Sequence, residues 1–215
     1  MRRVIPLLAA ALGAAAIAGC DRGDQQTRTA PVTRTSGKAA IGGPFSLKDQ
    51  TGRPVTDRDL IGKPSLIFFG FTSCPEVCPT TLMHMSKWLK DLGPDGDKLN
   101  ALYVTVDPER DTAAQIKQYL SAFDPRIRGL TGSPAAVAEI AKNYRVYYNR
   151  VPLENGSYTM DHSTMVYMMD AQGEFVGPIG YNEPDADVMP LLRDLVAGRR
   201  PISHGSGGAS TPTER

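Results

Sequence analysis

The chain has 215 residues, and its 24 lysines and arginines nearly balance 23 aspartates and glutamates, which leaves a formal net charge of +1. This balance argues against a nucleic-acid binder and against an acidic scaffold. Three cysteines are too few for a disulfide-rich scaffold. The length suits one globular domain with additional segments at its ends.

The N-terminal segment has the layout of a secretory signal peptide, because Arg2 and Arg3 precede an apolar run from Val4 to Ala18. The tetrapeptide Ile17-Ala18-Gly19-Cys20 resembles a bacterial lipobox. This resemblance implies that residues 1–19 are removed and that Cys20 is lipidated. The alternative is an uncleaved anchor, but the run is shorter than the roughly 20 residues that a spanning helix needs. We therefore expect a lipid-anchored protein on the periplasmic or extracytoplasmic face of the cytoplasmic membrane.

Residues 20–40 are polar and lack apolar periodicity, which predicts a flexible tether. Residues 199–215 contain Ser, Gly, Thr and Pro without an apolar face, which predicts a disordered tail. The folded unit is expected between them, over residues 41–198.

The folded unit is expected to begin with a short hairpin around the turn Asp49–Gly52, followed by a buried strand over Ser65–Phe71. The next expected elements are a helix over Thr80–Leu92, a strand over Leu99–Val106, a helix over Thr112–Phe123 capped by Asp111 or Thr112, a strand over Arg126–Thr131 and a helix over Ala135–Tyr144.

The second half shows a different pattern. Adjacent antiparallel strands are expected over Val146–Tyr148, Thr164–Met169 and Glu174–Ile179, and a closing helix over Asp185–Val196. This order predicts an α/β thioredoxin-like fold, with a central mixed sheet flanked by helices and an added N-terminal β-hairpin.

Cys74 and Cys78 directly follow the buried strand, and Pro79 suits an early helical position. Residues at i and i+4 share a helix face, so the two sulfurs are expected to lie close together. The positive end of a helix stabilises thiolates. Such a pair can hold a soft metal ion or form a disulfide.

The motif departs from thioredoxin, because three residues separate the cysteines and no proline enters the late strand. His162 occupies that neighbourhood instead. If the fold is thioredoxin-like, strand topology brings His162 across from Cys74 and Cys78.

Four segments in this order resemble the Sco/SenC family of copper-binding assembly proteins: Phe69–Pro79, Val106–Thr112, Asp161–Ser163 and Met169–Phe175. The resemblance covers the whole folded unit. It implies a membrane-tethered metallochaperone that helps assemble the dinuclear copper site of cytochrome c oxidase. It also implies Cys74, Cys78 and His162 as the metal ligands. The expected partners are the copper-accepting oxidase subunit, other copper chaperones or thiol-disulfide reductases, and the membrane through the lipid.

Two thiolates and one imidazole suit Cu(I) and also accommodate Cu(II). Zinc is the competing ion, but a structural zinc site takes four protein ligands. Asp161 is a candidate fourth ligand; alternatively, Asp161 or a nearby backbone carbonyl orients the ring of His162. The loop Asp107–Asp111 is interpreted as a turn and helix cap, and the resemblance also suggests a role for it near the site or in partner recognition. Met83, His84 and Met85 are further donors, for which packing or surface roles are the simpler interpretation.

Other functions remain open at this point. Cys74 and Cys78 can form a purely structural disulfide. In a thiol-disulfide oxidoreductase, Cys74 attacks a partner disulfide, Cys78 resolves the intermediate and His162 tunes the thiol pKa. A peroxidase is the weaker third interpretation, because no separate Thr/Arg constellation accompanies Cys74. The favoured hypothesis is a copper carrier that is not an enzyme in the turnover sense.

Overall fold

The computed structural model describes residues 41–200. The predicted signal peptide, the lipidation site at Cys20, the tether and residues 201–215 of the predicted tail lie outside this range. Within residues 41–200, no helix combines the length and the apolar character needed to cross a membrane.

Strand β3 (Ser65–Gly70) lies at the centre of the domain, and all six of its residues are buried. It pairs in parallel with β4 (Asn100–Thr105) and in antiparallel fashion with β8 (Val166–Met169). A continuous apolar run suits a strand covered on both faces. The ring of Phe68 packs against Tyr103, whereas Phe69 packs against Tyr144 and Tyr167.

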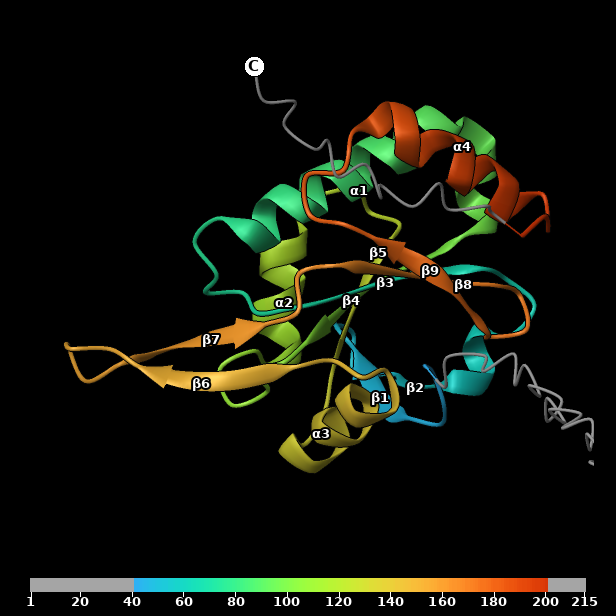
Figure 1. The fold of residues 1–215 in the computed structure, drawn as a ribbon. Coiled ribbons are helices and arrows are strands. Elements are labelled where there is room, and N and C mark those ends of the chain that lie inside the picture. Colours follow the sequence, from blue (N-terminus) through green and yellow to red (C-terminus); the bar gives the residue numbers. More distant parts are fainter. Residues whose placement is uncertain (1–40, 201–215) are drawn as a thin grey trace, which may run out of the picture. The chain divides into compact units, whose positions relative to one another are not determined.

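The central sheet has seven strands in the order β2-β1-β5-β4-β3-β8-β9, with both parallel and antiparallel pairs (Figure 1). The predicted N-terminal hairpin is confirmed as an antiparallel pair at one edge of this sheet. The mixed sheet flanked by helices is the architecture that the sequence predicts. The remaining strands of this sheet are β1 (Ser46–Asp49), β2 (Pro54–Thr56), β5 (Ile127–Thr131) and β9 (Phe175–Ile179).

Helices α1 and α4 pack side by side over one face of the sheet (Figure 1). Helix α2 lies on the same face, because its Tyr119 packs against Tyr103. Helix α3 is followed by Tyr144, which packs on the opposite face against Phe69. The helices are α1 (Val77–Leu92), α2 (Ala113–Leu120), α3 (Pro134–Asn143) and α4 (Asp185–Val196), with short 3-10 turns at η1 (Asp57–Leu60) and η2 (Gly93–Lys98).

Two helix boundaries bear on the site. Helix α1 begins at Val77 rather than Thr80, which places Cys78 inside its first turn. Helix α2 has Thr112 as its N-cap, whose side chain accepts a hydrogen bond from the backbone N–H of Gln115. Asp111, the alternative cap, is free to make the contacts described below.

The sequence-based pairing is wrong between residues 146 and 169. Strands β6 (Tyr148–Pro152) and β7 (Tyr158–His162) pair only with each other, as a separate two-stranded ribbon that projects from the domain (Figure 1). Strand β7 was not expected, and β8 pairs with β3 and β9 instead of with β6. Strand β6 is largely exposed and β7 is mostly half-buried, and neither has the continuous apolar run that identifies a buried strand.

The absence of a side chain at Gly70 allows α1 to approach the sheet closely, which generates a stability prediction. A Cβ atom there would lie 2.9 Å from the sulfur of Cys78 and 3.1 Å from ring atoms of Phe68 and Tyr103. Overpacking of this kind costs about 1–3 kcal/mol, so Gly70→Ala should lower the free energy of unfolding by that amount in urea titrations. Gly177→Ala is the matched control, because its Cβ would make only an ordinary 3.7 Å contact. Equal stability of the two variants would contradict the packing argument.

Candidate metal centre

The two cysteines lie where the chain turns from β3 into α1. The backbone N–H of Cys74 donates a hydrogen bond to the carbonyl of Phe71 at 3.2 Å, which closes this turn. The backbone N–H of Cys78 in turn donates to the sulfur of Cys74 at 3.4 Å. Cys74 is half-buried, Cys78 is completely buried, and both are free thiols.

His162 reaches the cysteines from the end of the separate ribbon, as the last residue of β7. Its Nε2 lies 3.6 Å from the sulfur of Cys78, and its Nδ1 lies 2.7 Å from the carbonyl oxygen of Ser163. A carbonyl only accepts hydrogen bonds, so Nδ1 carries the proton and the lone pair of Nε2 faces the sulfur. The rings of Phe68 and Phe71 pack against the imidazole and hold its plane.

The three donor atoms of Cys74, Cys78 and His162 lie within 4.8 Å of one another. Within residues 41–200 there is no second group of three or more His, Cys, Asp or Glu side chains so arranged. An ion bound at about 2.3 Å from sulfur and about 2.1 Å from nitrogen holds those two donors within about 4.4 Å of each other. The separation of 3.6 Å between the Cys78 sulfur and the imidazole nitrogen satisfies this limit.

The two thiols differ in their affinity for a proton. The side-chain hydrogen bond from Cys78 lowers the pKa of Cys74 to about 4, and partial burial opposes this effect. For Cys78 the same hydrogen bond, burial and the neighbouring thiolate charge all raise the pKa. At neutral pH the pair therefore holds one thiolate, at the more exposed sulfur, and one thiol beneath it.

The other donors suggested by the sequence lie outside this group. Asp161 is exposed, and as the neighbour of His162 in a strand it points to the opposite side. The carbonyl of Ser163 is the partner of the imidazole Nδ1. His84 Nδ1 lies 3.4 Å from a carboxylate oxygen of Asp185 on α4. Met85 is buried in the core, whereas Met83 is 64% exposed.

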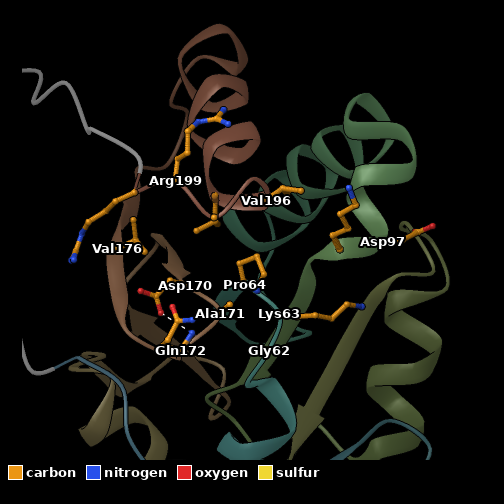
Figure 2. A pocket seen from close by; sticks show the side chains of 14 residues that line it. Gly62, Lys63, Pro64, Asp97, Asp170, Ala171, Gln172, Val176, Val196 and Arg199 are labelled. Carbon is orange, nitrogen blue, oxygen red and sulfur yellow. Dashed lines mark hydrogen bonds between the residues drawn. The ribbon is translucent and has the colours of Figure 1, made fainter.

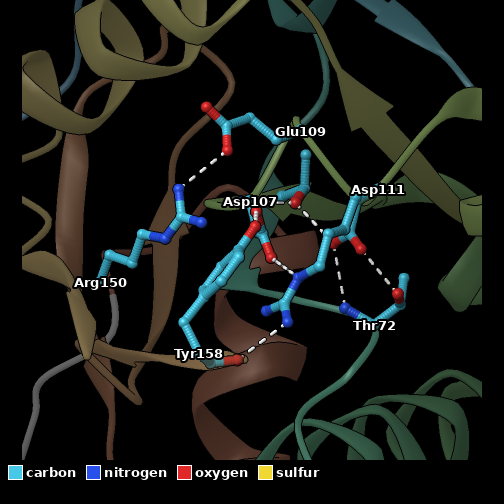
Figure 3. A network of polar contacts seen from close by, with 8 residues as sticks. Thr72, Asp107, Glu109, Asp111, Arg150 and Tyr158 are labelled. Atoms are coloured by element: carbon cyan, nitrogen blue, oxygen red, sulfur yellow. Dashed lines mark hydrogen bonds and ion pairs between the residues drawn. The ribbon is translucent and has the colours of Figure 1, made fainter. Parts of the chain in front are cut away.

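The loop after β4 carries a buried polar network next to the cysteine turn (Figure 3). The carboxylate of Asp111 accepts hydrogen bonds from the backbone N–H and hydroxyl of Thr72, at 3.0 and 2.6 Å, and from the hydroxyl of Thr105 at 2.6 Å. Burial raises the pKa of Asp111, and the hydrogen bonds from Thr105 and Thr72 oppose this effect. Asp111 thereby fixes the turn two residues before Cys74.

Asp107 belongs to the same network. Arg110 and Asp111 lie within the loop for which the resemblance suggests a role near the site, although neither was singled out from the sequence as a site residue, and Tyr158 was not identified at all. A signal for the first two was available. They follow β4, which is parallel to β3, and the carboxyl ends of parallel neighbours meet at one edge of a sheet. No comparable local signal marks Tyr158.

A cavity of about 620 Å³ lies away from this group, near the start of β3 (Figure 2). Its wall includes Lys63, Pro64, Ala171, Val196 and Arg199. The cysteines lie beyond the other end of the same strand, so the cavity has no part in the candidate metal centre.

The fold and the site together define a thioredoxin-like protein in which a Cys-x-x-x-Cys turn faces a histidine. The family model described as SCO1/SenC matches residues 33–197. The chain belongs to this family.

Related sequences and solved structures agree. The mitochondrial proteins SCO2 and SCO1 of Saccharomyces cerevisiae are 37% and 43% identical to this chain over 172 and 158 residues, or 79% and 72% of its length. These matches cover 57% and 54% of the two relatives, so the chain spans about half of their length.

Two solved structures of relatives contain copper. Copper-bound ScoI of Bradyrhizobium japonicum is 51% identical, with a TM-score of 0.69 over 73% of this chain and 99% of that one. Copper-bound yeast Sco1 is 37% identical, with a TM-score of 0.69 over 80% of this chain and 96% of that one. These neighbours confirm the predicted thioredoxin-like fold.

The unequal thiols generate a pH prediction. A lowered pKa keeps the Cys74 thiolate present at every pH above its own value, so alkylation by iodoacetamide should remain fast in mild acid and decline with a midpoint near pH 4. Cys78 should stay unmodified in the folded protein. Mass spectrometry of quenched samples measures both sites.

The variant Cys78→Ala removes the hydrogen-bond donor, so the alkylation midpoint of Cys74 should move to higher pH. A midpoint near the ordinary thiol pKa of about 8.5 in the unmodified protein, or faster reaction at Cys78, would contradict the assignment.

Proposed function

We propose that this protein is a membrane-anchored, extracytoplasmic copper metallochaperone that helps to assemble the dinuclear copper site of cytochrome c oxidase. The convergence of Cys74, Cys78 and His162 carries the proposal, because their donor atoms form one soft, compact set. The copper-bound structures of relatives support the choice of metal. The receiving partner is proposed to be the copper-accepting subunit of the oxidase, with other copper chaperones or thiol-disulfide reductases as further partners.

The unequal burial of the donors suits a carrier. Cys78 holds copper from the core side, and its proton is released on binding because a thiol ligates as thiolate. Cys74 is half-buried and already a thiolate, so it is the sulfur that a partner can reach. With three protein donors, one side of the ion stays open to an incoming thiolate. Copper can therefore pass to the partner by stepwise ligand exchange.

Oxidation of the pair is proposed to control this exchange. A partner disulfide that accepts two electrons and one proton from the reduced pair leaves a Cys74–Cys78 disulfide, which removes two of the three donors, so the oxidised protein should not retain copper. The anchor is proposed from the lipobox-like segment ending at Cys20. A solved SCO1/SenC family lipoprotein of Bacillus anthracis, 25% identical with a TM-score of 0.63, supports it.

Thiol-disulfide exchange is the second candidate function, and the difference between the two thiols favours it. The Cys74 thiolate attacks a partner disulfide and forms a mixed disulfide; Cys78 then attacks the sulfur of Cys74 and releases the partner as a dithiol. Two electrons pass to the partner, and the Cys74–Cys78 disulfide remains. The two functions are compatible, because an acceptor must have reduced cysteines before copper enters.

Anaerobic copper titration tests the first function. The reduced full-length protein in detergent should hold one copper against a Cu(I) chelator, and Cys74→Ser, Cys78→Ser and His162→Ala should each weaken or abolish binding, because each removes one donor. Bound metal is counted by atomic absorption after competition. His84→Ala is the matched control, since His84 lies outside the donor group, and should bind as the unmodified protein does. Weak binding that is indifferent to His162 would refute the proposal.

A second measurement separates the two functions. His162→Ala removes a metal ligand but leaves both sulfurs, so it should greatly weaken copper binding while changing the rate of disulfide exchange only moderately. The rate is followed by stopped flow with a model protein disulfide. An exchange rate that falls as far as the copper affinity would instead place His162 at the centre of the redox reaction.

A further inference from the structure

We propose that Arg110 is a positioning residue: together with Asp107 and Tyr158 it fastens the β6–β7 ribbon to the body of the domain and so sets the distance of the His162 imidazole from the two sulfurs. This inference rests on the proposed copper site. It concerns a contact outside the donor group, between the loop after β4 and the beginning of β7 (Figure 3).

Tyr158 makes three contacts with the loop after β4. Its hydroxyl donates to a carboxylate oxygen of Asp107 at 2.9 Å, and its carbonyl accepts from Nη1 of Arg110 at 2.9 Å. The guanidinium carbon of Arg110 lies 3.8 Å from the centre of the tyrosine ring. Arg110 and Asp107 are themselves joined by an ion pair through Nε. Asp107 is only 4% exposed and Arg110 is 28% exposed, so this contact is a partly buried ion pair rather than a fully exposed one.

The position of His162 depends on this attachment because both residues belong to one strand. Tyr158 and His162 are four residues apart in β7, so their side chains lie on the same side of the strand. Within residues 41–200, β7 pairs with no strand other than β6. An isolated two-stranded hairpin is marginally stable at best. Contacts with the rest of the domain must therefore set the direction in which the ribbon leaves it.

The same network continues to the cysteine turn. The backbone N–H of Asp107 donates to the hydroxyl of Thr105 at 2.9 Å, and that hydroxyl donates to Asp111, which holds Thr72. An unbroken series of hydrogen bonds thus connects the strand that carries His162 with the turn that carries Cys74. The imidazole and the sulfurs come from different parts of the fold, and this series is a physical link between them.

Arg110 is also connected to His162 through aromatic packing. The guanidinium carbon of Arg110 lies 5.9 Å from the ring centre of Phe71, and the ring centre of Phe71 lies 5.7 Å from that of His162. Removal of Arg110 would loosen the ribbon at Tyr158. It would also remove a neighbour of the Phe71 ring, which packs against the imidazole of His162.

Arg150 provides a matched control. Its guanidinium carbon also lies over the ring of Tyr158, at 3.5 Å, but its ion pair is with Glu109, and both side chains are more than half exposed. Exposed ion pairs contribute little to stability. Arg150→Met and Arg110→Met therefore remove the same group from the same ring, and only the second disturbs the buried network.

The experiment uses full-length protein in detergent and two readouts: Cu(I) affinity by chelator competition, and the spectra of the Cu(II) form by electron paramagnetic resonance and optical absorption. Arg110→Met should weaken copper binding by about tenfold, the scale typical for residues that orient a ligand. It should also reduce the hyperfine coupling to imidazole nitrogen while the sulfur-to-copper charge-transfer band persists. Arg150→Met should match the unmodified protein in both readouts.

The double variant Arg110→Met/His162→Ala tests whether Arg110 affects copper binding through His162. If Arg110 acts through His162, its loss should add less than about a twofold effect once the imidazole is gone, because residues acting through one interaction are not additive. An equal loss in both backgrounds would overturn the inference, as would unchanged binding in Arg110→Met. If Arg110→Met does not fold, Tyr158→Phe takes its place, because it removes only the hydroxyl contact with Asp107. Its copper affinity is then compared in the presence and absence of His162→Ala in the same way.

Failure of the proposed copper-binding function can be distinguished from failure of the proposed positioning role of Arg110. Copper binding by the unmodified protein that is indifferent to His162→Ala would refute the proposed function. Binding that needs His162 but is unaffected by Arg110→Met and Tyr158→Phe would refute only the positioning role.

Discussion

The close approach of α1 to the end of β3 is the constraint on which the site depends. It exists because Gly70 has no side chain where the sulfur of Cys78 lies. This contact takes one thiol into the core and leaves Cys74, four residues earlier and before the helix begins, half-buried. The different environments follow from this single packing arrangement, and so does the different proton affinity of the two sulfurs. A motif that is nearly symmetric in sequence thereby becomes asymmetric in chemistry.

The two halves of the donor group are organised by different forces. Hydrophobic burial fixes the cysteines, because β3 and the inner face of α1 belong to the core. Polar and aromatic contacts at the edge of the domain fix His162, which enters on a ribbon outside the main sheet. Buried carboxylates at Asp107 and Asp111 join these two regions. They are tolerated inside the protein because each accepts several hydrogen bonds.

Elements defined by local signals could be predicted from the sequence. The buried apolar run identifies β3, Ser133 caps α3, and α4 has the predicted bounds of Asp185–Val196. Strand β7 was missed because its contacts are distant: Tyr158 bonds to residues 48 and 51 positions earlier in the chain. The meeting of His162 with the cysteines was expected from the topology of the fold, whereas its hydrogen bond to the carbonyl of Ser163 depends on local geometry that residue types do not encode.

The separate ribbon has a consequence for the kinetics of the copper transfer proposed above. Because β6 and β7 pair with no strand of the central sheet, the ribbon can open as a local unit without unfolding the core. Such an opening withdraws the imidazole while the two sulfurs stay in place. Bound metal favours the closed form by mass action, and an acceptor meets a site with fewer ligands each time the ribbon opens. For the copper carrier proposed above, the lifetime of the loaded form would then depend on a local opening rate as well as on the stability of the whole domain.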